Sequence, residues 1–291
     1  HIHSRLGSIP LSRILEPAIQ IAKSGAIINN AHEYLFNILD PILSHTKSGE
    51  ILFKPNGGKI KTGERFKNPD FADYLEQIII EGSNFLYRGD FTAKIDDYMK
   101  DGGLLTKEDL LNYEVIERIP LKTDFNGKTI ITNPLPSPGG TLITFVLKII
   151  SQQFPGEKID NRLLTLGMRL AQIVYSEKIL AKNKSSSLAK LLDPSYFNRY
   201  INFFDSEISL RLSKENSGSG STTHLSIIDS KGNAASVTTT NGEGCGYIIP
   251  GTGIMMNNML GEDDLNPDGF HNWKTTKRMS TMMSPTIVIG D

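Results

Sequence analysis

The chain has 291 residues, of which 38% are hydrophobic and 22% are charged, with 31 basic and 32 acidic side chains. This size suits one large domain or two ordinary ones, and a net charge of −1 gives no electrostatic basis for binding nucleic acid or an anionic membrane. The single cysteine, Cys245, excludes an internal disulfide and any cysteine-based zinc site.

The amino-terminal segment contains no apolar run long enough for a signal sequence or a membrane span. Apolar residues at helical spacing predict a helix over residues 1–25, with Pro10 in its first turn and Gly25 at its end. Five apolar residues are expected to share its buried face: Ile14, Leu15, Ala18, Ile19 and Ala22.

A mixed segment and further helices are predicted after this first helix. The pattern is mixed over 26–66, whereas helices are predicted around 71–81 and 91–100. Thr106 is expected to cap a further short helix, because acidic residues follow it in the favourable first turn.

A hairpin and two longer helices are expected in the middle of the chain. Residues 115–132 read as strands joined by a turn at Asn126-Gly127. The segment 134–140 is expected to be irregular and rigid, and to lead into an apolar helix over 141–150. An amphipathic helix over 163–182 follows, with five expected core residues: Leu163, Leu166, Leu170, Ile173 and Val174.

The character of the sequence changes near residue 213. Residues 213–221 are small, polar and glycine-rich, which predicts a solvated, flexible loop. After the loop the chain becomes strand-rich, with strands expected over 222–229, 234–240, 253–258 and 282–289. Helices that precede strands, with no glycine-rich fingerprint after a first strand, argue against a dinucleotide-binding fold.

The junction of loop and strand carries the most informative chemistry. If the bond between Ser221 and Thr222 were cut, Thr222 would carry a hydroxyl and a free α-amine on one residue. Such an amine has a pKa of about 7.7–8.0, so it can remove the hydroxyl proton near neutral pH. The alternative is an ordinary strand edge rich in serine and threonine.

Several motifs occur in a fixed order along the chain. Those after the loop are Thr222-Thr223-His224-Leu225-Ser226, Asp229, Gly232-Asn233, Val237-Thr238-Thr239-Thr240, Pro250-Gly251-Thr252-Gly253 through Asn257-Asn258, and Ser284-Pro285-Thr286-Ile287. Those before it are Pro10-Leu11, Glu16-Pro17-Ala18, Gly102-Gly103-Leu104-Leu105-Thr106 and Pro136-Ser137-Pro138-Gly139-Gly140. This series resembles the γ-glutamyltranspeptidase family of Ntn-hydrolases, from the second half of the large subunit to the start of the small subunit.

The resemblance implies an α/β fold, the layered αββα sandwich of the Ntn-hydrolases, which is incomplete over these residues. It implies a precursor that cuts itself between Ser221 and Thr222. Residues 1–221 would then be the carboxyl-terminal part of the large-subunit region, and 222–291 the amino-terminal part of the small-subunit region, paired as a heterodimer. No metal, cofactor or nucleic acid is expected. Family members are often exported or surface-anchored, but these residues do not locate the protein.

The resemblance also implies the reaction of a γ-glutamyltransferase or glutathione hydrolase. The Thr222 hydroxyl would attack the γ-amide carbonyl of glutathione or a related γ-glutamyl compound. The resulting ester would pass its acyl group to water or to an amino acid or peptide. Thr240 matches a second threonine, whose hydroxyl supports the new amino terminus.

Residues that bind the substrate carry over unevenly. The family usually has Asn or Glu at position 242 to bind the substrate's α-amine, and this chain has glycine there. Its neighbours Asn241 and Glu243 are therefore both candidates for that role.

Four further positions concern the same ligand. Asn258 is expected to bind substrate, and Glu262 keeps an acid that can pair with the α-ammonium. Thr281 can still donate to the substrate carboxylate. Met259 stands where the family has Gln or Glu, and Met282 where it has Ser, so neither can make the usual polar contact.

These departures weaken the case for strict γ-glutamyl specificity more than the case for acylase chemistry. Two alternatives follow: an acylase for glutaryl or cephalosporin-type amides, and an unprocessed, inactive family member. The resemblance places the family's oxyanion glycines and its carboxylate-binding arginine outside residues 1–291. The 291 residues alone are therefore expected to be inactive.

Two other reactive side chains are expected to have no catalytic role. His224 lies beside the nucleophile and is expected to make a structural hydrogen bond. Cys245 has no paired base that would activate its thiol.

Overall fold

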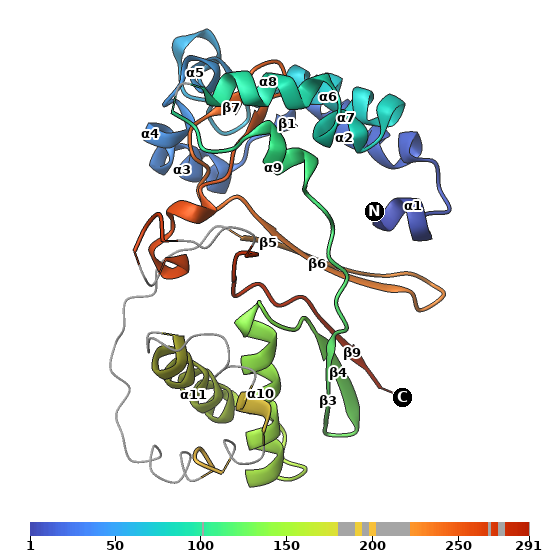
Figure 1. The fold of residues 1–291 in the computed structure, drawn as a ribbon, viewed down its shortest axis with the longest axis vertical. Helices are drawn as coiled ribbons and strands as arrows, with labels where there is room; N and C mark the ends of the chain where they lie inside the picture. Colours follow the sequence, from blue (N-terminus) through green and yellow to red (C-terminus); the bar gives the residue numbers. More distant parts are fainter. Residues whose placement is uncertain are drawn as a thin grey trace. The chain divides into compact units, whose positions relative to one another are not determined.

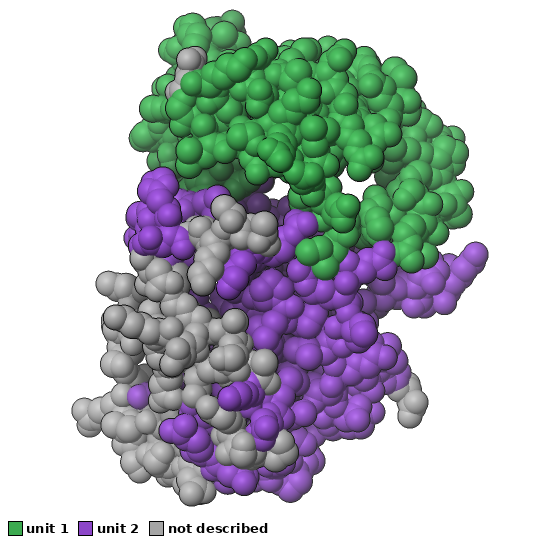
Figure 2. All heavy atoms as spheres, viewed as in Figure 1, with its two compact units in different colours: residues 1–116, 243–258 green, residues 117–242, 259–291 purple. Residues whose placement is uncertain are grey.

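A computed structural model of the chain describes residues 1–100, 102–179, 190–193, 198–201, 222–266, 269–272 and 277–290 (Figure 1). The chain forms two compact units: unit 1 contains residues 1–116 and 243–258, and unit 2 contains residues 117–242 and 259–291 (Figure 2). Each unit is a set of residues that pack together, whereas the expected boundary at 221/222 is a site of scission. The division into 1–221 and 222–291 therefore stays a prediction.

Unit 1 is mainly helical. Two short antiparallel pairs accompany the helices, β1 (Ala26–Ile27) with β2 (Arg65–Phe66), and β7 (Ile248–Ile249) with β8 (Ile254–Met255). Its helices are α1 (Ile2–Leu6), α2 (Leu11–Ser24), α3 (Asn30–Ile38), α4 (Asp40–Leu43), α5 (Lys47–Phe53), the 3-10 turn η1 (Pro55–Gly57), α6 (Pro69–Glu81), α7 (Asn84–Tyr87), α8 (Asp90–Met99) and α9 (Lys107–Leu111).

The core of unit 1 forms where α2 packs on α6, and residues of α8 belong to the same buried cluster. Ile19 and Ala22 of α2 are buried in one cluster with residues of α6, α8 and β7: Ala72, Tyr74, Leu75, Phe91, Ile95 and Ile249. The single helix expected over 1–25 is wrong, because the chain leaves the helical path at Gly7 and Pro10 caps α2 from outside it. Ile14 is 48% exposed and Ala18 is also exposed, so the buried face is narrower than expected.

Other helix predictions for unit 1 are confirmed by local capping chemistry. Thr106 caps α9, its hydroxyl accepting from the backbone N–H of Asp109, whose carboxylate accepts from the Thr106 N–H in return. Asn68 accepts from the Phe71 N–H at the start of α6 in the same way.

In the described part of unit 2, two antiparallel sheets accompany two long helices. Strands β3 (Leu121–Phe125), β4 (Lys128–Thr132) and β9 (Thr286–Ile289) form one sheet in the order β3-β4-β9, while β5 (Thr222–Ile228) and β6 (Ala234–Thr240) form the other. The helices are α10 (Pro138–Gln153) and α11 (Asn161–Ile179), with the 3-10 turns η2 (Lys190–Leu192), η3 (Met259–Gly261) and η4 (Asp263–Leu265).

The core of unit 2 lies around α10, which packs on both α11 and β3 (Figure 1). It contains Leu142, Phe145, Ile149, Ile150, Leu170, Val174, Leu191 and Tyr200. Gly167 lets α10 and α11 approach closely, since a Cβ there would lie 2.8 Å from Cγ1 of Val146. The helix α10 begins at Pro138, so residues 138–140 are helical and not irregular as expected. Residues 180–182, expected to end α11, lie outside the described residues, as does the loop 213–221.

The strand predictions are confirmed where turn chemistry is local. Asn126 and Gly127 have φ values of 49° and 74°, as a tight hairpin between β3 and β4 requires. The strands expected over 253–258 and 282–289 are much shorter, because pairing is limited to β8 and β9. Before β9, Pro285 lacks an N–H, and the carbonyls of Thr281 and Met283 accept from side chains.

Candidate active site

The hairpin of β5 and β6 carries both predicted catalytic residues. Its register pairs Thr222 with Thr240 and continues without a break to Ile228, which pairs with Ala234. Directly paired residues of an antiparallel ladder share a face of the sheet, so Thr222 and Thr240 project to the same side. The structure therefore brings the predicted nucleophile and its predicted supporting hydroxyl together at one end of the hairpin.

The turn at the other end fixes this register. One carboxylate oxygen of Asp229 accepts hydrogen bonds from the backbone N–H groups of Lys231 and Asn233, each at 2.8 Å, and the other accepts from Nδ2 of Asn233. These bonds hold the pKa of Asp229 below its ordinary value, with the Asn233 side chain as the largest cause. Because a slip of one residue would move every side chain to the opposite face, this turn determines where Thr222 projects.

The two faces of the hairpin differ in chemistry. The face that contains Thr222 and Thr240 also carries four further polar residues, His224, Ser226, Ser236 and Thr238. The opposite face carries mainly apolar residues, among them Leu225, Ile227 and Val237, which are exposed. Ser236 joins the polar face to the other sheet, since its hydroxyl accepts from the Thr286 N–H at 3.1 Å.

His224 is held within the polar face by hydroxyl groups. Its Nδ1 lies 2.8 Å from Oγ1 of Thr238, and its Nε2 lies 2.9 Å from Oγ of Ser226. The expected structural hydrogen bond is present. Both ring nitrogens are engaged by hydroxyl groups of the hairpin itself, so the imidazole braces β5 against β6.

The chain turns sharply just after Thr240. Gly242 has a φ of 59°, and its N–H donates to Oγ1 of Thr240 at 3.0 Å. Asn241 lies in this turn and is exposed. A positive φ favours glycine, which accounts for Gly242 standing where the family usually has a side chain that binds substrate.

Two of the predicted substrate-binding residues form a reciprocal pair in unit 1. The Glu243 N–H donates to Oδ1 of Asn258 at 3.0 Å, and Nδ2 of Asn258 donates to Oε2 of Glu243 at 3.1 Å. Both side chains are half-buried. One hydrogen bond from the Asn258 amide therefore holds the Glu243 carboxylate, and a carboxylate is the group that pairs with a ligand ammonium.

Glu262 and Thr281 occupy separate segments of unit 2. Glu262 lies between η3 and η4 and is half-buried, as Thr281 is in the segment before β9. Within the described residues, no hydrogen bond joins Thr222 to either of them. Met259 is only 8% exposed, so an apolar side chain suits its position. Ser221 lies outside the described residues.

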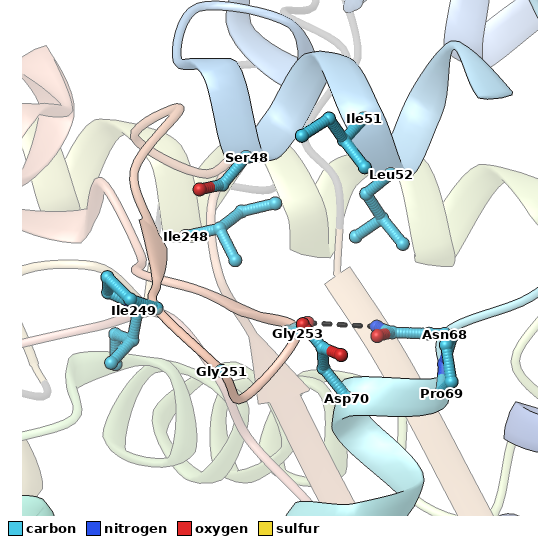
Figure 3. A pocket seen from close by; sticks show the side chains of 11 residues that line it. Ser48, Ile51, Leu52, Asn68, Pro69, Asp70, Ile248, Ile249, Gly251 and Gly253 are labelled. Atoms are coloured by element: carbon cyan, nitrogen blue, oxygen red, sulfur yellow. Dashed lines mark hydrogen bonds between the residues drawn. The ribbon is translucent and has the colours of Figure 1, made fainter. Parts of the chain in front are cut away.

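A small pocket in unit 1 is lined by none of the predicted site residues (Figure 3). Residues of α5, the start of α6 and the turn between β7 and β8 line it, and Nδ2 of Asn68 donates to the Gly253 carbonyl at 2.9 Å. A Cβ on Gly253 would lie 1.9 Å from Oδ1 of Asn68. The Pro250–Gly253 motif is therefore a structural turn, anchored to α6.

The sequence did not single out Asn133 or Ser137 as side chains that bind the segment before β9. Their partners lie about 150 residues later in the chain. Ser137 stands out in the sequence only because it lies in a motif that resembles the family. Among the described residues no group of His, Cys, Asp and Glu could hold a metal ion, and no described helix is both long and apolar enough to cross a membrane.

Comparisons with known proteins identify the family to which the chain belongs. The chain matches the model of the Gamma-glutamyltranspeptidase family over residues 1–291. It is 30% identical to the glutathione hydrolase proenzyme of Pseudomonas aeruginosa, over 99% of this chain and 55% of the relative. It is also 30% identical to the acylase ACY 1 proenzyme of Pseudomonas sp. (strain SE83), over 99% of this chain and 54% of the relative.

A solved structure extends the likeness to the fold. The cephalosporin acylase from Bacillus halodurans has a TM-score of 0.76 and 23% identity, over 99% of this chain and 55% of that chain. The chain spans about half the length of the curated relatives that it matches. The expected α/β class of the Ntn-hydrolases is confirmed. The family match over the whole chain leads to one conclusion: this chain belongs to the γ-glutamyltranspeptidase family.

Proposed function

We propose that this chain carries the nucleophile of a γ-glutamyltransferase or glutathione hydrolase. Scission between Ser221 and Thr222 frees the Thr222 amine, and the Thr222 hydroxyl then forms a γ-glutamyl ester with glutathione or a related γ-glutamyl amide. The observation that carries the proposal is the register of β5 and β6, which sets Thr222 opposite Thr240. Membership of the family supports it.

The proton balance of the first step follows from the free amine. The α-amine of Thr222 takes the hydroxyl proton as the oxygen attacks the γ-amide carbonyl, and it later gives that proton to the departing nitrogen. An ester to Thr222 remains. Water or the amine of an amino acid or peptide then attacks the ester carbonyl and loses a proton to the α-amine. The bond between the carbonyl carbon and the Thr222 oxygen breaks, this oxygen takes the proton from the α-ammonium, and glutamate or a new γ-glutamyl amide is released.

The remaining site residues either hold the Thr222 amine or bind the charged groups of the donor. The Thr240 hydroxyl receives a hydrogen bond from the new ammonium or amine of Thr222. Glu243, held by Asn258, and Glu262 provide negative charge for the donor's α-ammonium, and exposed Asn241 offers a further amide. Thr281 donates to the α-carboxylate. These groups recognise both charges of a γ-glutamyl donor.

The two products of scission are expected to stay together as a heterodimer. Strand β4 comes from the part before Ser221 and pairs along four residues with β9, which comes from the part after it. The hydrogen bonds from Ser137 and Asn133 to residues 281 and 283 also cross the scission point. None of these contacts depends on the bond that is cut.

A second candidate function is an acylase for glutaryl or cephalosporin-type amides. Buried Met259 and exposed Met282 cannot make the polar contacts usual in the family, and an acylase is among the relatives. Glutaryl donors lack only the α-amine, so they separate the two functions. A third possibility is a member that never matures and has no activity.

Rates on two chromogenic donors test the proposal in the full-length protein. A γ-glutamyl enzyme turns over γ-glutamyl-p-nitroanilide at least about tenfold better than glutaryl-p-nitroanilide, because the second donor has no ammonium group to pair with the half-buried carboxylates. The reverse order supports the acylase. No turnover of either donor by a protein that remains one polypeptide on a denaturing gel supports the inactive form.

A further inference from the structure

The segment before β9 is held by side chains and not by strand pairing. Oγ of Ser137 lies 2.6 Å from the Thr281 carbonyl oxygen and 2.7 Å from the Met283 carbonyl oxygen. Nδ2 of Asn133 also donates to the Met283 carbonyl, at 2.8 Å. In return, the Ser280 hydroxyl donates to the Pro136 carbonyl at 2.6 Å. These four bonds form a clamp between residues 133–137 and residues 280–283.

The hydroxyl of Ser137 is used for this clamp instead of for its own helix. Ser137 is the N-cap of α10, a position where serine usually accepts a hydrogen bond from the first turn, yet it makes no such bond here. Its one proton is shared between the two carbonyls that flank Met282. The serine therefore restrains the backbone on both sides of one residue.

The first turn of α10 lies in close contact with this segment. A Cβ on Gly139 would lie 2.0 Å from Oγ of Ser284 and 2.4 Å from the Met282 carbonyl oxygen. A Cβ on Gly140 would lie 2.0 Å from the Asn133 carbonyl oxygen. The two glycines thus allow the helix and the segment to contact each other through their backbones.

From these contacts we propose that Ser137 is a positioning residue, which sets where the Thr281 hydroxyl lies and thereby controls recognition of the donor's carboxylate. The inference rests on the function proposed above, in which Thr281 binds that carboxylate. Ser137 bonds to the backbone carbonyl of Thr281 and leaves the Thr281 hydroxyl to the ligand. Loss of the clamp would let Thr281 move, while the hairpin that carries Thr222 would stay in place.

The test uses full-length protein with Ser137→Ala, and Ser137→Thr as the conservative variant. Ser44→Ala is the matched control, because the Ser44 hydroxyl is also half-buried and donates to a backbone carbonyl at 2.7 Å, but in unit 1. The donors are the p-nitroanilides of γ-glutamate, glutarate and 4-aminobutyrate. The third donor lacks the carboxylate that Thr281 would bind.

The proposal predicts that Ser137→Ala raises KM about tenfold for the γ-glutamyl and glutaryl donors, the equivalent of one hydrogen bond. Both kcat and the rate on the 4-aminobutyryl donor should stay within about twofold of wild type. Ser137→Thr restores the low KM, and Ser44→Ala never raises it. If Ser137→Ala does not fold, Ser280→Ala, which removes only the bond to Pro136, should give the same pattern at about threefold.

Equal losses on all three donors, or none, would overturn the role of Ser137. The donor preference of the wild-type protein tests the proposed function separately. If it has no preference for donors with a carboxylate over the 4-aminobutyryl donor, the carboxylate role of Thr281 fails first, and the role of Ser137 falls with it.

Discussion

Thr222 pairs directly with Thr240 across β5 and β6, so two hydroxyl groups share one face at the open end of the hairpin. A chain that began at Thr222 would place its amine next to the Thr240 side chain. This relationship depends on a register that the Asp229 turn fixes at the opposite end.

Removal of the Thr240 hydroxyl should slow the reaction. We expect Thr240→Val to lower kcat/KM by about 10- to 100-fold, since a hydrogen bond to a charged amine contributes about 1.5–3 kcal/mol. Thr239→Val is the control, because Thr239 pairs with Thr223 on the opposite face. Steady-state rates of the two variants check this, and equal losses would contradict the role given to Thr240.

His224 should prove structural. His224→Gln removes a ring whose two nitrogens contact Thr238 and Ser226, and we expect a lower midpoint of thermal unfolding with kcat within about threefold of wild type. A variant whose pH–rate profile lost a limb that the wild-type profile has would show that His224 acts in catalysis.

The hairpin turn should weaken in acid. Because its pKa in the folded chain is lowered, Asp229 stabilises the turn fully above its unfolded pKa of about 3.9. That stabilisation is lost as the pH falls through the lowered folded value. Hydrogen-exchange protection at Lys231 and Asn233 should therefore decrease between pH 5 and strongly acidic conditions, while Asp229→Asn shows low protection throughout. Protection in the variant that follows the wild-type pH dependence would assign the effect to another group.

Glu243 should distinguish donors by their amine. We expect Glu243→Gln to raise KM for γ-glutamyl-p-nitroanilide about tenfold and to leave the glutaryl donor within about twofold, because only the first carries an ammonium group. Glu108→Gln, on exposed α9, is the matched control. An equal loss on both donors would mean that Glu243 supports the fold through Asn258 and does not bind the amine.

Local chemistry made part of the fold predictable from sequence. The turn at Asn126-Gly127 and the cap at Thr106 were correct, because the residues that make them lie within a few positions of one another. The start of α10 was missed because Pro138 reads as a helix breaker unless its place in the first turn is known. Helices α3 to α5 were missed because short helices carry few periodic residues.

Part of the candidate site could also be predicted from local sequence, and part could not. Thr222 and Thr240 could be paired from the hairpin pattern, since a short turn connects their strands. The choice of Glu243 over Asn241 as the partner of Asn258 could not be made, because it depends on how a loop folds back. Ser137 and Thr281 lie 144 residues apart, and no local pattern in the sequence brings them together.

Sequencing the amino terminus of the smaller product of the full-length protein tests the central claim most directly. The account predicts two polypeptides, the smaller beginning Thr-Thr-His-Leu-Ser, and a Thr222→Ala variant that remains one inactive chain. A Thr222→Ala protein that is still cut before residue 222 and still releases p-nitroaniline from γ-glutamyl-p-nitroanilide would contradict it.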